Sequence, residues 1–143
     1  MVNTTVILGI DHGNVRTGIA ATDEQGMMAF PVMTVTQTYM PKLIAQIAEI
    51  IKERNCGLAV VGLPRNMDGT EGSRADECRE FAAALSQSTG IKVELIDERL
   101  TTVQAARDLT DAGVFGKKRK NSIDTQSAVL ILQSYLDKEK RSQ

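Results

Sequence analysis

The feature that most constrains this chain is an apolar run near its N-terminus that ends in a single carboxylate. Residues 5–10 read Thr-Val-Ile-Leu-Gly-Ile, and Asp11 follows directly. A run this apolar and rich in β-branched residues predicts a strand buried on both faces, at the centre of its sheet. An ionised carboxylate at the end of a buried strand costs free energy unless it pairs or binds a cation. Asp11 is therefore a candidate functional residue, although an Asp two residues before Gly13 also suits a simple turn.

Two further strands are expected directly after this one, at residues 16–23 and 27–36, with a turn signal between them at residues 23–26. Pro31 lies inside the second of these strands, and proline cannot donate a backbone hydrogen bond. We therefore expect an antiparallel three-strand meander whose third strand lies at an edge of the sheet.

From Pro41 onward, apolar residues recur every three or four positions instead of every second position. This predicts a helix that starts near Pro41 and stops near residues 55–57. A buried strand at residues 58–63 follows it. The next helix is expected to begin with Ser73 as its cap, in a capping box with Asp76, and to close at Gly90.

The last part of the chain predicts one more strand and two more helices. The strand is expected at residues 92–96. Thr101 or Thr102 can cap the helix that follows, which stops at Gly113. A basic loop at residues 117–120 would then lead to Ser122, a plausible cap for the last helix.

The element order is therefore β-β-β-α-β-α-β-α-α. It predicts an α/β fold with a five-stranded mixed sheet, in which an antiparallel meander is joined to parallel strands and flanked by helices. The chain has 143 residues and no long linker, so we expect one domain over residues 1–143. Ligands gather at the carboxyl ends of strands in such sheets. Asp11, residues 64–66 and residues 97–98 all fall at those ends.

Composition excludes several functional classes. With 42% hydrophobic and 24% charged residues, the chain has an ordinary soluble composition. The net charge of −1 means that any nucleic-acid site must be local, and 3% aromatic residues without Trp argue against base-stacking platforms. Its two cysteines lack metal-like spacing. We find no signal peptide and no long apolar run, and expect a cytoplasmic protein.

The last predicted helix adds a second carboxylate. Asp124, Ala128, Ile131 and Tyr135 are separated by four, three and four residues, so they share one stripe of the helix. We expect this stripe to face the sheet, with Asp124 in the contact or at its edge. The alternative is an Asp that stabilises the helix dipole, worth about 0.3–1 kcal/mol.

Acidic groups from distant parts of the chain (Asp11, the pair Asp97 and Glu98, and Asp124) could thus converge. Like charges brought together destabilise the fold unless cations neutralise them. Oxygen ligands without His or Cys suit Mg²⁺ or Mn²⁺, and two such ions can drive hydrolysis of a phosphate ester. Alternatively, the pair at 97–98 is solvated or binds Arg99.

The single histidine and the basic run near the C-terminal end are two further candidates for a functional role. His12, the only histidine, cannot share the face of Asp11, because neighbouring side chains of a strand point to opposite faces. We expect it to be a packing or surface residue. The basic run at residues 117–120 would ordinarily be a solvated loop, but its position just before Asp124 makes it a candidate for contact with a nucleic-acid backbone.

Four segments, in order, carry a family resemblance. Residues 9–20 (GIDHGNVRTGIA) resemble the opening GxDxGxxRxGxA motif of the YqgF (RuvX) family. Residues 60–64 (VVGLP), with Asn66, Asp68 and Gly69, resemble its second motif, and residues 97–102 (DERLTT) its third. Residues 118–120, 123–124 and 131–136 resemble its C-terminal block. His12, Arg65 and Ser127 depart from the family's usual residues.

This resemblance implies an RNase H-like fold related to Holliday-junction resolvases, and a role in maturing the 5′ end of 16S ribosomal RNA. It implies that Asp11, Glu98 and Asp124 are the catalytic and metal-binding residues, which favours Glu98 over Asp97. The residues expected to bind substrate are Gly13, Arg16, Asn66, Arg99, Thr101, Lys118, Arg119 and Lys120. Arg65 could alter substrate preference.

We therefore expect a hydrolase: a nuclease with a two-metal-ion mechanism that uses Mg²⁺ or Mn²⁺. Its expected partner is structured RNA, with pre-16S rRNA favoured over branched DNA, and ribosomal particles are a further partner. It would be a monomer or homodimer without membrane contact.

Three alternatives remain. The first is a Holliday junction resolvase-like DNA nuclease, and the second is a ribosome-associated nucleic-acid-binding protein with little catalysis. The third is an ATP-binding module like those of actin and hexokinase. That module needs a second half, for which 143 residues leave no room.

Overall fold

The structure is a computed structural model that describes residues 5–100 and 117–141, with side chains described for residues 5–99 and 125–140. The helix expected between Thr101 and Gly113 lies outside the described residues, as does Thr101 itself. The side chains of Asp124 and of the basic run at residues 117–120 also lie outside the described part.

The sheet has the mixed, five-stranded form that the sequence predicts. Its strands, in chain order, are β1 (Val6–His12), β2 (Arg16–Thr22), β3 (Ala29–Thr36), β4 (Cys56–Leu63) and β5 (Lys92–Asp97). Their order in the sheet is β3-β2-β1-β4-β5. The antiparallel pairs are β1–β2 and β2–β3, and the parallel pairs are β1–β4 and β4–β5. Thus β1 is central, and Pro31 lies on an edge strand, as expected.

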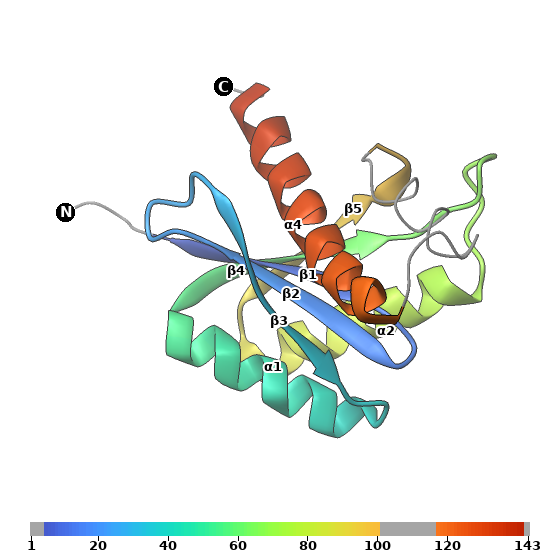
Figure 1. Ribbon diagram of the computed structural model, residues 1–143, viewed down its shortest axis with the longest axis horizontal. Coiled ribbons are helices and arrows are strands. Elements are labelled where there is room, and N and C mark those ends of the chain that lie inside the picture. The colour runs from blue at the N-terminus through green and yellow to red at the C-terminus, as the bar shows by residue number, and fades with distance from the viewer. Residues whose placement is uncertain (1–4, 101–116, 142–143) are drawn as a thin grey trace.

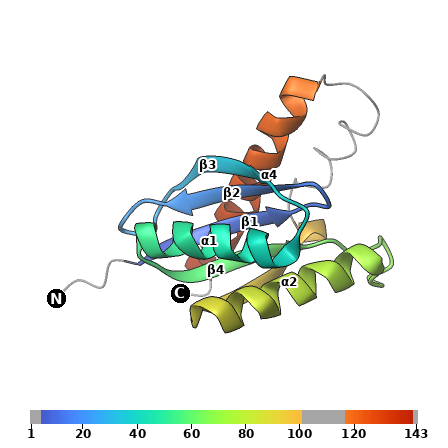
Figure 2. The ribbon, with the colours of Figure 1, turned by 90° about the horizontal axis from the view of Figure 1, so that it is seen from below.

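Helices cover the two faces of the sheet (Figures 1 and 2). On one face lie α1 (Met40–Arg54) and α2 (Ser73–Thr89), and on the other lies the long α4 (Lys117–Arg141). A short 3₁₀ turn, η1 (Glu98–Leu100), follows β5 directly. Among the described residues, no helix combines the length and apolar character that crossing a membrane requires.

The larger part of the core lies between the sheet and the helices α1 and α2. Leu8 and Ile10 of β1 pack there with Phe81 of α2. The His12 ring stacks on Phe81 with the ring centroids 4.4 Å apart, and its Nδ1 lies 3.3 Å from Thr17 Oγ1. Burial lowers the pKa of His12 below its usual 6.5, with a further contribution from Arg74. The histidine is therefore a packing residue on the face opposite α4, as the alternation along β1 predicts.

The other face packs closely against α4. Ala128, Ile131 and Leu132 are completely buried, so the part of the predicted stripe at Ala128 and Ile131 faces the sheet. Gly9 makes the contact possible, because a Cβ atom there would lie 2.6 Å from Leu132 Cβ and 2.9 Å from the carbonyl oxygen of Ala128. The central strand and α4 thus meet almost backbone to backbone.

Two sequence-based expectations about helix starts are wrong. Gly72, not Ser73, is the N-cap of α2; it makes no side-chain cap hydrogen bond, and the backbone N–H of Asp76 donates to its carbonyl oxygen at 3.2 Å. Glycine is an acceptable cap, and Ser73 becomes the first helical residue. Likewise, residues 117–120 form the first turn of α4 instead of a loop. Lys and Arg are good helix formers, so the helix extends through the basic run.

We predict that Gly9→Ala destabilises the protein, because the new methyl group would push α4 away from the sheet. Overpacking of this kind costs about 1–3 kcal/mol, measurable by denaturant unfolding. Gly57→Ala is the matched control: it also adds a methyl group to a strand, but meets only Thr5 Cγ2, at 3.1 Å. Equal stability of the Gly9→Ala variant and wild type would contradict the close packing of α4.

Candidate active site

Two buried carboxylates lie on the α4 face of the sheet. The exposed fractions are 3% for Asp11 and 1% for Glu98. Asp11 is two residues after Gly9 in β1, so its side chain points to the same face as that glycine, toward α4. This placement explains its burial, since α4 covers that face.

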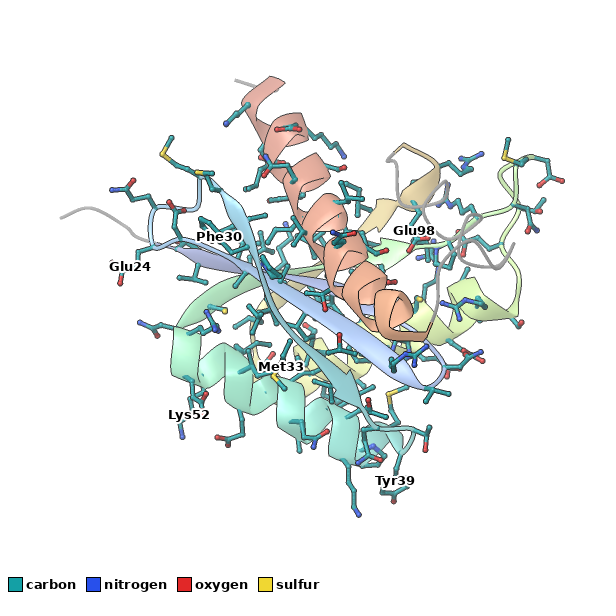
Figure 3. The ribbon with its side chains drawn as sticks, in the orientation of Figure 1. Glu24, Phe30, Met33, Tyr39, Lys52 and Glu98 are labelled. Carbon is teal, nitrogen blue, oxygen red and sulfur yellow. The ribbon has the colours of Figure 1, made fainter. Side chains whose placement is uncertain are left out.

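Glu98 reaches this face from the end of β5. It is the first residue of η1, and its Oε1 lies 2.7 Å from the position that a Cβ of Gly62 would occupy. The same position is 2.5 Å from Ile131 Cδ1. Gly62 therefore leaves the space between β4 and α4 that the carboxylate of Glu98 fills, and Figure 3 shows Glu98 beside α4.

The strand register brings the two carboxylates together. Ile10 of β1 pairs with Val61 of β4, so Asp11 and Gly62 are the next neighbours across this parallel pair. Adjacent strands are about 4.8 Å apart. Asp11 and the carboxylate over Gly62 therefore lie on one face, about one strand spacing apart. Two of the three acidic positions singled out in the sequence converge in this way.

The third acidic position, Asp124, belongs to α4, and its side chain lies outside the described part. In the helix it comes one turn before Ala128, whose carbonyl oxygen contacts the Gly9 position. The next residue, Thr125, has its Oγ1 2.8 Å from Thr34 Oγ1 on β3. This hydrogen bond holds Thr125, the first residue of α4 with a described side chain, over β3 in the antiparallel half of the sheet.

Asp97 has a different environment from Glu98. Its carboxylate accepts hydrogen bonds from the backbone N–H of Arg99 at 2.9 Å and from Arg99 Nη2 at 2.8 Å. Arg65 Nη1 lies 3.5 Å from the same carboxylate. The hydrogen bond from Arg99, above all, holds the pKa of Asp97 below its usual value. Of the alternatives open for this pair, the ion pair with Arg99 is the one found for Asp97.

Several residues expected to bind substrate have structural partners. Arg99 is held by Asp97. Asn66 shapes its own loop, because its Nδ2 donates to Thr70 Oγ1 at 2.9 Å and its carbonyl oxygen accepts from the N–H of Gly69 at 2.9 Å. Gly13 closes the β1–β2 connection: its N–H donates to the Arg16 carbonyl at 3.0 Å, and a Cβ there would lie 2.5 Å from that oxygen. These contacts give each of the three residues a role in the local structure.

The donor chemistry of the site fits a hard divalent cation. Asp11 and Glu98 supply carboxylate oxygens, the ligands that Mg²⁺ and Mn²⁺ prefer. In the part of the chain with described side chains, no group of three or more His, Cys, Asp or Glu residues is placed to hold a metal ion. Asp124 is the further carboxylate that the helix would have to supply.

Two residues of this region are not among the expected site residues. Gly62 lies within the second motif, and a glycine inside an apolar strand is a sign of close approach by another group. Glu71 has no signal in the sequence, because its partners Arg65 and Arg79 are brought to it only by the folded loop.

The fold of this chain is similar to that of solved Holliday junction resolvases. Thermus thermophilus RuvC, solved in complex with a Holliday junction substrate, has a TM-score of 0.60 at 12% identity, over 95% of this chain and 96% of that one. The yeast mitochondrial Holliday junction resolvase Ydc2 has a TM-score of 0.56 at 12% identity, over 95% and 79% of the two chains. These likenesses establish the RNase H-like fold.

The sequence comparisons are more specific. Residues 5–138 match the family model described as "RuvX: Holliday junction resolvase". A protein of Lachnospira eligens with the name "Putative pre-16S rRNA nuclease" is 44% identical over 138 residues, covering 94% of this chain and 99% of its own length. A Myxococcus xanthus protein of the same name is 43% identical over 130 residues, covering 91% of this chain and 86% of its own. The chain belongs to the RuvX family, as its motifs indicate.

We predict that Glu71→Gln lowers the melting temperature at pH 7 by a few degrees at most, as expected for an exposed ion pair. The hydrogen bond from Arg79, above all, lowers the pKa of Glu71 below its usual 4.5. A carboxylate with a lowered folded-state pKa stabilises the fold above its unfolded pKa, and this stabilisation is lost as the pH falls through the folded pKa.

The difference between wild type and Glu71→Gln should therefore decline as the pH falls below the usual pKa of 4.5 and vanish below the lowered folded-state pKa, as followed by thermal melts over a pH series. Glu53→Gln, on the exposed side of α1, is the control. A difference that persists undiminished in acid would mean that the charge of Glu71 is not what stabilises the loop.

Proposed function

We propose that this protein is a metal-dependent endonuclease that hydrolyses phosphodiester bonds in structured RNA. The observation that carries the proposal is the buried pair of Asp11 and Glu98, gathered under α4 at the carboxyl ends of β1 and β5. Two carboxylates one strand spacing apart on one face supply oxygen ligands that Mg²⁺ or Mn²⁺ can share. A site that binds cations through carboxylates suits phosphate ester hydrolysis.

The names of the relatives support RNA as the substrate. Those with high identity over nearly the whole chain carry a name that specifies pre-16S rRNA. We therefore favour maturation of the 5′ end of pre-16S rRNA, in the cytoplasm and with ribosomal particles as partners. Branched DNA is the second candidate, because the family model is described by the Holliday junction.

In this proposal, Asp11, Glu98 and Asp124 hold Mg²⁺ or Mn²⁺. When bound, two such ions supply an activated water and stabilise the leaving oxygen. The protein itself excludes bulk water with the apolar face of α4, and fixes Glu98 in the space that Gly62 leaves. Arg16 and the basic first turn of α4 contact phosphates. Arg99 does so only when phosphate competes with Asp97.

We predict that Asp11→Asn abolishes cleavage of a labelled pre-16S rRNA precursor in Mg²⁺ or Mn²⁺, because it removes a metal ligand while leaving the shape of the side chain unchanged. Cleavage products mapped to the nucleotide are the measurement. Asp76→Asn makes the same change at an exposed position of α2 and should cleave like wild type. Cleavage by Asp11→Asn at the wild-type rate in saturating Mg²⁺ would refute the enzymatic proposal.

We also predict that metal binding stabilises the fold. A ligand that binds only the folded state contributes about 2.7 kcal/mol at a hundredfold excess over Kd, a shift of several degrees for a domain of this size. Wild type should gain this shift with Mn²⁺ in thermal melts. Asp11→Asn and Glu98→Gln should start at least as stable, since repulsion is relieved, and should gain little.

The exposed variant Glu53→Gln should gain as much from Mn²⁺ as wild type does. If Mn²⁺ stabilised wild type, Asp11→Asn and Glu98→Gln equally, the ions would bind elsewhere on the protein. This measurement does not depend on having found the right substrate.

A further inference from the structure

A chain of alternating charges leads from α2 to the residue next to Glu98. Arg79 Nε lies 2.7 Å from Glu71 Oε1, and Arg65 Nη2 lies 3.1 Å from Glu71 Oε2. On its other side Arg65 Nη1 lies 3.5 Å from Asp97 Oδ2, and Arg99 Nη2 lies 2.8 Å from the same oxygen. Asp97, between Arg65 and Arg99, is the least exposed member of this chain, with a side chain 15% exposed.

The backbone hydrogen bond of Asp97 sets the turn that contains Glu98. Asp97 Oδ1 accepts the N–H of Arg99, two residues later, at 2.9 Å. An Asp that accepts from the backbone two residues on stabilises a tight turn. The residue inside this turn is Glu98, and the turn begins η1. It therefore directs Glu98 toward Gly62 while Asp97 itself points to the arginines.

The charge of Asp97 holds two guanidinium groups at the same edge of the sheet. The side chains of Arg65 and Arg99 are 30% and 32% exposed, so both can be reached from solvent. Within the described part, Arg65 Nε is buried without a hydrogen-bond partner, which is a cost that the contacts of its other nitrogens offset. A phosphodiester that approached this edge would compete with Asp97 for both arginines, since Arg binds phosphate as well as carboxylate.

We propose that Asp97 is a positioning residue with two separable effects: its turn orients Glu98 in the site, and its charge restrains Arg65 and Arg99 until a nucleic-acid phosphate competes for them. The inference rests on the proposed function insofar as it takes nucleic acid as the substrate. The proposal predicts two opposite effects of removing the Asp97 side chain: nucleic acid should bind more tightly, and the metal site should bind its ion more weakly.

Two variants separate these effects. Asp97→Asn keeps an oxygen that can accept the N–H of Arg99 but removes the charge, whereas Asp97→Ala removes both. Glu94→Gln is the matched control, because it neutralises a carboxylate of the same strand that pairs with Lys92 at 2.9 Å. Each full-length variant is assayed for binding of a labelled pre-16S rRNA fragment without metal over a salt series. The Mn²⁺ concentration at the midpoint of thermal stabilisation, and cleavage, are measured in parallel.

Both Asp97 variants should bind the RNA more tightly than wild type. The slope of log affinity against log salt should steepen by about 0.7 for each additional phosphate that the freed arginines neutralise. Asp97→Asn should keep a Mn²⁺ midpoint and a turnover close to wild type. Asp97→Ala should need more Mn²⁺ and lose turnover on the order of tenfold or more, because a misplaced catalytic group is costly. Glu94→Gln should match wild type in every assay.

RNA affinity and salt slope equal to wild type in both Asp97 variants would overturn the proposal. So would a wild-type Mn²⁺ midpoint in Asp97→Ala. These failures differ from failure of the proposed function, in which wild type cleaves no RNA while the Asp97 variants still shift RNA binding and the Mn²⁺ midpoint as expected. In that case the positioning role of Asp97 stands, and only the reaction has to be reassigned.

Discussion

The close approach of α4 to the sheet is the constraint on which the rest of the site depends. At Gly9 the helix comes so near that a Cβ atom would collide with Leu132, and at Gly62 it leaves room only for the tip of Ile131 and the carboxylate of Glu98. Glycine is required at both positions for its lack of a side chain. Since α4 also carries Asp124, the depth at which the helix packs sets how far that residue stands from Asp11.

This packing also sets the electrostatic environment of the two carboxylates. A helix that seals the face buries Asp11 and Glu98 to 3% and 1% exposure, so water screens their charges little. At this edge of the sheet Arg65 and Arg99 pair with Asp97, and Arg65 also pairs with Glu71. In the proposed function a cation binds to the carboxylates under α4 only in the folded state, so metal affinity and fold stability are linked.

The sequence predicted the sheet and most helices because their signals are local: the apolar run before Asp11, the change of period after Pro41, the proline that marks an edge strand. The prediction from sequence is wrong where two neighbouring residues can both cap a helix: Gly72, and not Ser73, is the N-cap of α2. It was also wrong at the basic run, where helix propensity extends α4 beyond the expected cap. The depth of Glu98 and the cradle at Gly62 could not be predicted, because both depend on atoms from α4.

The local sequence pattern does not decide which of the adjacent carboxylates Asp97 and Glu98 is buried. Adjacent carboxylates at a strand end are chemically alike, and the residues alone allowed both to be solvated. What separates them is where the strand ends: β5 stops at Asp97, and the 3₁₀ turn begins at Glu98. The N–H of Arg99 donates to Asp97 Oδ1 at 2.9 Å across this boundary, and the positioning role proposed for Asp97 rests on that hydrogen bond.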